Sequence, residues 1–439
     1  MDWQEEYKQK LTSAEEAMKI VKSGDRVVIP MGREPQALGL ALAMRRDELK
    51  NVEVLVSTIG IDFGWYDPGW EDSFTVRTRY VYPRGIGREW MDRKQGDYVV
   101  SLTGLLLKGE IERPHENRPP DVALIEISTP DEHGFCSFGA SVWDKKEQAL
   151  IARHTVAEVN ANLIRTGGDN YIHVSQVDAF VEHTPSPKAW SFEKTEVSDT
   201  VKAIAGFVST LVKDRDTVQI GLGRASYPLV DAGAFDDKHD LGIHSEVLAP
   251  GLPRLIESGV VTGKYKTLHK GKVVATACGG ARGSDMRFYN NNPIIELYAS
   301  GYVNNVRTIA SHENMVSINN ALCVDLTGQV ASESMGPRMY AGPGGQTEFA
   351  IGAALATGGR SIIVLPSTAE KGTVSRIVPM LEQGTIVTVP RTFVDYVVTE
   401  HGVARLWGKS QRQRAVELIA IAHPDFRAEL KKASEELYG

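Results

Sequence analysis

The sequence predicts an α/β protein made of two related open sheets, each covered by helices. Short apolar segments bounded by Gly or Pro alternate with segments of helical periodicity along the chain, as in parallel sheets with crossover helices. Residues 215–229 also echo residues 24–38. Each copy follows a predicted helix. Near its end, each copy contains Gly-Arg followed by Pro and Leu. A duplicated α/β unit explains this echo, although chance similarity between two common helix–strand–Gly segments is the alternative.

Composition excludes several classes of protein. The chain has 439 residues, with 42% hydrophobic and 24% charged residues, which is too apolar for a disordered chain. Its 49 Lys and Arg against 56 Asp and Glu give a net charge of −7, which argues against a nucleic-acid partner. No apolar run approaches the roughly 20 residues that span a bilayer. The acidic N-terminal segment does not resemble a signal peptide, so we expect a cytoplasmic protein without a membrane partner.

The cysteines indicate neither disulfide bonds nor a metal site. Cys136, Cys278 and Cys323 are widely separated, and none belongs to a CxxC pair. No HExxH motif is present, and the spacing between His239 and His244 fits no standard metal pattern.

The first half of the chain predicts a helix followed by repeated strand and helix segments. Ser13 with Glu16 has the form of a capping box, and Gly24 ends the helix that follows. We expect strands over residues 26–30, 52–57 and 122–127, and a helix over residues 36–45. Residues 183–192 are rich in Pro and Ser and form the best linker candidate. We therefore predict two domains, residues 1–195 and 196–439.

The second half repeats this pattern. Helical periodicity covers residues 201–212, 348–356 and 411–421, and the last of these begins a charged run to Tyr438 that we expect to be a solvated face. Strands are expected over residues 217–220, 241–244, 273–277, 294–298 and 361–365.

Two glycine-rich stretches follow or precede these elements. The first consists of Gly221, Leu222, Gly223, Arg224 and Ala225, directly after a strand. Its amides could meet a ligand, and a following helix N-terminus would favour an anion, but a tight turn explains it equally well. The second stretch, residues 342–346, contains Gly344 and Gly345 before a helix. Its amides could form an oxyanion hole or phosphate cradle, or the stretch could be a structural loop.

Several polar side chains are also candidates. Glu246 lies where a buried strand ends, the edge at which open α/β sheets bind ligands, so it could be a nucleophile or a general base. A solvated Glu is the alternative, and His244 could equally be a structural strand histidine. Asp131-Glu132-His133-Gly134 reads as a polar turn that could also form a substrate wall. Lys371 and Arg376 could meet phosphates, although such residues are commonly solvated.

Taken together, seven segments resemble the acetyl-CoA hydrolase/transferase family, which includes butyryl-CoA:acetate and 4-hydroxybutyrate CoA-transferases. They are PDEHGFCSFG at 130–139, GIHSE at 242–246, DLTGQV at 325–330, GPGGQTEF at 342–349, PSTAEKGTVSRIVP at 366–379, VVTEHGVARLWGKS at 397–410 and AIAHPDFRAEL at 420–430. The resemblance extends over essentially the whole chain. It implies two related α/β domains with the active site in the cleft between them.

The resemblance also implies roles for individual residues. Glu246 takes the role of the family's nucleophile, and Gly344 or Gly345 supplies the oxyanion donor. Contacts with coenzyme A are implied for Gly221, Leu222, Gly223, Arg224 and Ala225, for the segment of Asn319, Asn320 and Ala321, and for the GPGG loop. Arg224, Lys371 and Arg376 are candidate partners of its phosphates. Coenzyme A is then a substrate, no cofactor or metal is implied, and a homo-oligomer, a dimer or an even multiple, is expected.

Some positions differ from the family's pattern, and other functions stay open. Arg33 and Glu34 stand in a turn where smaller residues are expected, Glu370 stands where relatives often have Lys, and residues 279–283 form an unusual Gly-rich run. These differences concern the substrate acid. Acyl-CoA hydrolysis on the same site is one alternative to CoA transfer, and a non-catalytic CoA- or sugar-phosphate-binding protein is another.

Overall fold

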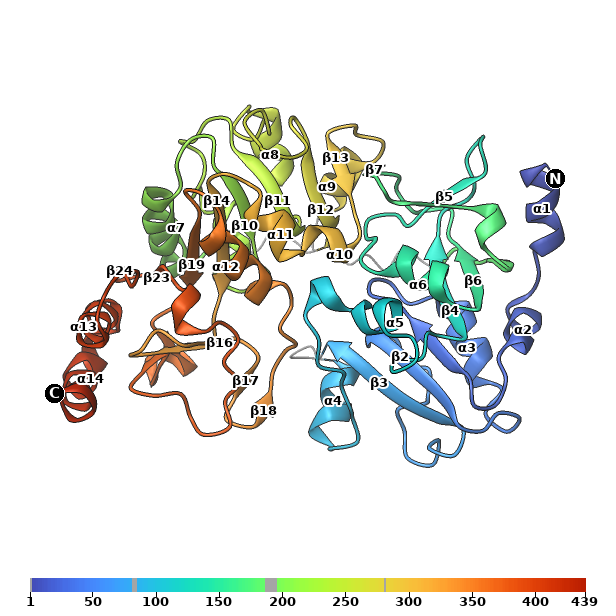
Figure 1. The fold of residues 1–439 in the computed structure, drawn as a ribbon, viewed down its shortest axis with the longest axis horizontal. Helices are drawn as coiled ribbons and strands as arrows, with labels where there is room; N and C mark the ends of the chain where they lie inside the picture. Colours follow the sequence, from blue (N-terminus) through green and yellow to red (C-terminus); the bar gives the residue numbers. More distant parts are fainter. Residues whose placement is uncertain (1, 81–84, 186–195, 280–281) are drawn as a thin grey trace. The chain divides into compact units, whose positions relative to one another are not determined.

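The computed structural model describes residues 2–80, 85–185, 196–279 and 282–439. The chain divides into two compact units (Figure 1). The first contains residues 1–189 and 289–301, and the second contains residues 190–288 and 302–439. The predicted domain boundary near residue 195 and most of the predicted linker lie outside the described residues, as do positions 280 and 281 of the Gly-rich run.

The first unit is built on a parallel sheet with the strand order β3-β2-β1-β4-β6-β9. Its strands are β1 (Arg26–Ile29), β2 (Val52–Thr58), β3 (Phe74–Tyr80), β4 (Val122–Ile127), β6 (His154–Val159) and β9 (Ala179–Glu182). Its helices are α1 (Trp3–Lys10), α2 (Ala14–Ala17), α3 (Gln36–Ala43), α4 (Ile86–Asp92), α5 (Lys108–Glu112) and α6 (Lys145–Ile151). Smaller pairs join β5 (Phe135–Ser137) to β8 (Tyr171–His173) and β7 (Gly167–Gly168) to β13 (Ile295–Leu297).

The main sheet of the second unit contains seven strands in the order β24-β23-β19-β14-β10-β11-β12. They are β10 (Thr217–Ile220), β11 (Gly242–Val247), β12 (Val273–Ala277), β14 (Met315–Asn320), β19 (Arg360–Val364), β23 (Tyr396–Thr399) and β24 (Gly402–Arg405). The remaining α-helices are α7 (Asp199–Leu211), α8 (Leu252–Glu257), α9 (Gly283–Tyr289), α10 (Ser300–Val303), α11 (Val306–Ala310), α12 (Gln346–Leu355), α13 (Gln411–Ile421) and α14 (Pro424–Tyr438). Short strands complete the unit: β15 (Cys323–Asp325), β16 (Val330–Ala331), β17 (Ser334–Met335), β18 (Arg338–Met339), β20 (Thr368–Ala369), β21 (Val374–Ser375) and β22 (Ile377–Val378).

The two sheets share one topology. In the first unit β1 lies between β2 and β4, where Val27 pairs with Val54 on one side and Val122 on the other. In the second unit β10 lies between β11 and β14, where Val218 pairs with Ile243 and Val316. In each sheet, the neighbours on the two sides of the central strand, β1 or β10, are therefore built by connections that run toward opposite edges. Such a switch point opens a crevice at the carboxyl ends of the strands.

Alternation along the strands explains the core of the first unit. Val27 and Ile29 of β1 point to one face and pack in a cluster with Leu38 and Leu42 of α3. Val28 points to the opposite face, in a smaller cluster with Leu55 and Ala123. Both faces of the sheet are therefore buried, as the continuous apolar strands predict.

Several predicted elements were correct, and others need correction. The strands at 122–127, 217–220 and 273–277 and the helix at 411–421 have the predicted bounds. The strand predicted at 241–244 continues to Val247, and helix α12 begins at Gln346 rather than residue 348. The residues 131–134 form the predicted turn before β5. Strands β3, β6, β9, β14 and β23 were not predicted.

The charged C-terminal run is also more than a solvated face. It forms two helices, α13 and α14, and α13 packs beside β24 (Figure 1). Ala415, Leu418, Ile421 and Leu430 are buried in a core cluster of this unit. The spacing of three residues places Ala415, Leu418 and Ile421 on one side of α13, and Leu430 is the buried residue of α14. Among the described residues, no helix combines the length and apolar character needed to cross a membrane.

Candidate active site

Glu246 is the second-to-last residue of strand β11, just before the chain leaves the sheet. Parallel pairing continues one residue past it, where Val247 of β11 pairs with Ala277 of β12. Side chains alternate along a strand, so Glu246 shares a face with His244, whereas Ser245 and Val247 point to the other face. The strand thus holds the Glu246 backbone rigidly and presents its partly buried carboxyl group at the carboxyl end of the sheet.

Two hydrogen-bond donors hold the Glu246 carboxylate. Nδ2 of Asn304 donates to Oε2 of Glu246 at 2.6 Å, and the amide of Gly345 also donates to the carboxylate. Burial raises the pKa of Glu246 to about 7, and the two donors partly offset this rise because they stabilise the charged form. A carboxyl group poised near neutrality is suited to act as a nucleophile or as a base.

The GPGG loop packs directly on this carboxylate. A Cβ atom at Gly345 would overlap Oε2 of Glu246 and Nδ2 of Asn304, whereas one at Gly344 would lie 3.8 Å from Oε1 of Glu246. Gly344 has a φ of +55°, a conformation that glycine adopts without strain. The structure therefore brings together the predicted residues Glu246, Gly344 and Gly345. Within the described part of the chain, the amide of Gly344 has no hydrogen-bond partner.

Asn304 is the residue of this site that sequence analysis did not find. Its side chain is fully buried just before helix α11, and Oδ1 has no partner among the described residues. The adjacent Asn305 is the N-cap of α11 and is the asparagine that a local pattern explains. No periodicity or motif distinguishes Asn304, because its role depends on a residue 58 positions earlier.

The first glycine-rich stretch lies at the switch point between β10 and β14. A Cβ at Gly221 would overlap Oδ1 of Asn319, and one at Gly223 would overlap the side chain of Asn320. The amide of Ala225 donates to Oδ1 of Asn320 at 3.1 Å, and Nδ2 of Asn320 donates to the carbonyl of Ala321. These glycines therefore allow a close approach of two chain segments. The helix N-terminus expected here is absent, since only the short 3₁₀ turn of residues 227–229 follows.

The candidate cations have different environments. Arg224 is exposed, as is the neighbouring Leu222. Arg376 is partly buried and donates to the carbonyls of Thr368 and Leu322. Burial lowers the pKa of Arg376, and the charge of Arg224 lowers it further. Lys371 is exposed, with a left-handed φ of 59°, on the short turn after β20.

His244 is a buried structural histidine of strand β11, which is the structural interpretation given from the sequence. Nε2 of His244 donates to the carbonyl of Val303, the residue before Asn304, at 2.9 Å. Its ring lies 4.5 Å from that of His312, and both rings are fully buried. Burial holds the pKa of His244 well below its usual range and lowers that of His312 to about 3. Both rings are therefore neutral at physiological pH.

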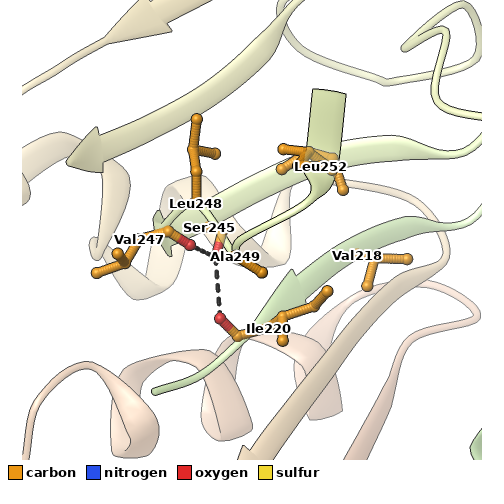
Figure 2. Close-up of a pocket in the computed structure, with 8 residues that line it drawn as sticks. Val218, Ile220, Ser245, Val247, Leu248, Ala249 and Leu252 are labelled. Carbon is orange, nitrogen blue, oxygen red and sulfur yellow. Dashed lines mark hydrogen bonds between the residues drawn. The ribbon is translucent and has the colours of Figure 1, made fainter. Parts of the chain in front are cut away.

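A small apolar cavity lies on the other face of β11 (Figure 2). It is bounded by Val218 and Ile220 of β10, by Val247 and Leu248, and by Leu252 of α8. Oγ of Ser245 donates to the carbonyl of Val247 at 2.8 Å inside this group. Since Glu246 points to the opposite face, this cavity belongs to the core beneath the candidate site. In the described part of the chain, no three His, Cys, Asp or Glu side chains gather closely enough to hold a metal ion.

Comparisons with known proteins identify the family of the chain. The acetyl-CoA hydrolase/transferase N-terminal domain matches residues 1–190, and the C-terminal domain of the same family matches residues 284–434. A 4-hydroxybutyrate coenzyme A transferase from Clostridium kluyveri is 41% identical, covering 98% of both chains. A butyryl-CoA:acetate CoA-transferase from Anaerostipes caccae is 34% identical over 99% of this chain and 98% of its own.

One solved structure and one more distant relative extend the comparison. The crystal structure of a 4-hydroxybutyrate CoA-transferase from Porphyromonas gingivalis is 36% identical, covers 100% of both chains and superposes with a TM-score of 0.81. An acetyl-CoA hydrolase from Schizosaccharomyces pombe is 25% identical over 74% of this chain and 68% of its own. The chain is an enzyme and belongs to the acetyl-CoA hydrolase/transferase family.

Proposed function

We propose that the protein is a CoA-transferase that moves coenzyme A between a short-chain acyl-CoA and a carboxylate, with acetate or acetyl-CoA on one side and a butyrate- or 4-hydroxybutyrate-like acid on the other. The observation that carries the proposal is the Glu246 carboxyl group at the edge of the sheet, held by Asn304 and Gly345 with a pKa of about 7. The names of the two full-length relatives described above support the substrate class.

The chemistry follows from a carboxylate nucleophile. Glu246 attacks the thioester carbonyl carbon of the acyl-CoA, the C–S bond breaks, and the thiolate of coenzyme A leaves an acyl–glutamyl anhydride. The thiolate then attacks the Glu246 carbonyl carbon, the anhydride C–O bond breaks, and the first acid leaves as its carboxylate. A second carboxylate reverses both steps and leaves as the new acyl-CoA, which gives ping-pong kinetics.

The backbone of the GPGG loop would stabilise the oxyanion of each tetrahedral intermediate. The Gly345 amide already holds the carboxylate, so the unpartnered amide of Gly344 is the better donor for the thioester oxygen. One such donor contributes roughly 3–4 kcal/mol of transition-state stabilisation. The stretch of residues 221–225, with Asn320, Ala321 and Lys371, would contact coenzyme A, and the cations Arg224 and Arg376 would face its phosphates.

Hydrolysis of an acyl-CoA at the same site is the second candidate function. It would need water rather than an acid to resolve the glutamyl intermediate. The relative named as a hydrolase is the more distant one, which favours transfer. With acetyl-CoA and an added acid such as butyrate, the protein should form butyryl-CoA and acetate without releasing free coenzyme A. Continuous release of free coenzyme A from acetyl-CoA in the absence of an added acid would favour hydrolysis.

Mass spectrometry of the trapped intermediate tests the mechanism. The protein is mixed with acetyl-CoA and then treated with borohydride, which reduces a glutamyl thioester. We expect a mass change located at residue 246, absent in Glu246→Gln. The exposed Glu257 at the end of α8 offers a matched control, because Glu257→Gln should keep both the modification and the activity. Turnover without a modified Glu246 would refute the scheme.

A further inference from the structure

The first unit carries a cluster of charged side chains at its own switch point. Arg33 follows strand β1, and Glu126 lies near the end of β4, the strand beside β1. Lys145 is the first residue of helix α6. This edge of the first sheet corresponds in topology to the edge of the second sheet that carries residues 221–225 and Asn320. Ligands of open α/β sheets bind at such crevices.

Lys145 is buried without enough hydrogen-bond acceptors. Its side chain is 2% exposed, and its one hydrogen bond in the described chain runs from Nζ to Oγ of Ser141 at 3.2 Å. An ammonium group has three N–H donors, so two are unused. Gly32 lies against it, because a Cβ there would stand 3.0 Å from Nζ and 2.8 Å from Oγ of Ser141. Burial lowers the pKa of Lys145 to about 8, which still leaves it mostly charged at neutral pH.

Lys145 and Arg33 both lie near the Glu126 carboxylate, and the charges of both act on it. Nε of Arg33 lies 3.3 Å from Oε1 of Glu126, and Asn160 donates to the same oxygen at 2.9 Å. Glu126 is therefore already engaged by Arg33 and Asn160. In the described chain, no carboxylate oxygen lies within ion-pair distance of the buried ammonium group of Lys145. Burying such a charge is unfavourable unless an anion joins it.

The other buried carboxylates near this edge have their own partners. Asp144 accepts from Arg79 at 2.7 Å and from the amide of Met31 at 3.0 Å. Glu158 is within 2.9 Å of Nδ1 of His183, and it accepts from three amides at the start of α3, those of Gln36, Ala37 and Leu38. Neither carboxylate comes within ion-pair distance of Lys145 in the described chain, although the charge of Asp144 partly offsets the effect of burial on the pKa of Lys145.

We propose that Lys145, Arg33 and Ser141 form a binding site in the first unit for the carboxylate of a small organic acid. A monoanion would pair with the ammonium group of Lys145 and accept hydrogen bonds from its unused N–H donors. A phosphate dianion fits less well, because its second charge would lie beside the Glu126 carboxylate. The identification of this acid with the carboxylate substrate rests on the proposed function, whereas the binding of a carboxylate does not.

The site can be tested by the direct binding of butyrate to the full-length protein, measured in a saturation-transfer NMR titration. Lys145→Met keeps the length of the side chain and removes its charge, so butyrate affinity should fall about tenfold or more. Lys146→Met is the matched control on the same helix, because Lys146 pairs with Asp169 and should not affect affinity. Arg33→Gln is a second variant at a partly exposed position. It should also weaken binding, because Lys145 and Glu126 would then neutralise each other.

Further arms separate this site from the proposed reaction. Glu246→Gln should lose transfer activity but keep butyrate binding that depends on Lys145, and inorganic phosphate should not displace butyrate. Wild-type affinity in folded Lys145→Met and Arg33→Gln would overturn the site, as would displacement by phosphate. If Glu246→Gln kept transfer activity while Lys145→Met lost butyrate binding, the proposed function would fail and this site would stand.

Discussion

Asn304 donates a 2.6 Å hydrogen bond to the Glu246 carboxylate from a position 58 residues further along the chain. The bond opposes the effect of burial, which raises the pKa of Glu246 to about 7. The protonation state of Glu246 is thus set by two competing influences. Burial of the side chain favours the protonated form, and the hydrogen bonds from Asn304 and Gly345 favour the ionised form.

The pH dependence of acyl transfer should report this balance. Only the ionised carboxylate can attack a thioester, so kcat/KM for acetyl-CoA should rise with pH and reach half its plateau near pH 7. The group is protonated and inactive well below that pH. A steady-state profile between about pH 5 and 9 measures the midpoint. A midpoint near 4.5, the ordinary value for Glu, would contradict the burial argument.

Replacing Asn304 by Ala should move this midpoint upward. The variant removes a donor that favours the charged form while burial persists, so the midpoint should rise by about one pH unit. Activity at neutral pH should fall, and higher pH should restore part of it. Asn305→Ala is the matched control, since it removes the N-cap of α11 next to Asn304 and should cost about 1 kcal/mol of stability without moving the midpoint. Equal shifts in both variants would exclude a specific role for Asn304.

The two loop glycines should respond differently to alanine. A Cβ at Gly345 overlaps Glu246 and Asn304, so Gly345→Ala should displace the carboxylate and lower kcat/KM by about 100-fold. A Cβ at Gly344 has room, 3.8 Å from Oε1 of Glu246, but its φ of +55° makes Gly344→Ala cost about 1–2 kcal/mol of stability. Activity assays and thermal unfolding distinguish the two effects. Wild-type activity in Gly345→Ala would refute the packing argument.

Gly223 and Gly206 make a second pair with opposite expected effects on stability. A Cβ at Gly223 overlaps Asn320 at the switch point, so Gly223→Ala should destabilise the protein by about 1–3 kcal/mol. Gly206 lies in helix α7 with open space around it, so Gly206→Ala should stabilise by about 0.5–1 kcal/mol. Urea unfolding measures both values. A stabilised Gly223→Ala would show that the close approach of Asn320 is not required.

How far the sequence could predict each element depended on the range of the interactions behind it. Strand β4 is apolar except for Glu126, and β10 is a short segment between a predicted helix and two glycines, so their local patterns sufficed. Strand β11 was predicted to end at His244 because polar Ser245 and Glu246 follow. Parallel pairing with β12 continues the strand to Val247 despite these side chains. Leu430 lies in the mostly polar sequence of helix α14, so the sequence pattern did not predict that this side chain packs in the core.

The sequence by itself determined the fold class and the family, because each depends on local patterns or on ordered motifs. Glu246, Gly344 and Gly345 came from those motifs as separate candidates. Only the tertiary structure decided that the Gly345 amide and Asn304 meet at the Glu246 carboxylate, and that Lys145 is buried beside Arg33 with donors unused. The physical reason is that burial and hydrogen-bond distance arise between segments distant in the chain, and these quantities set the pKa and charge balance of a site.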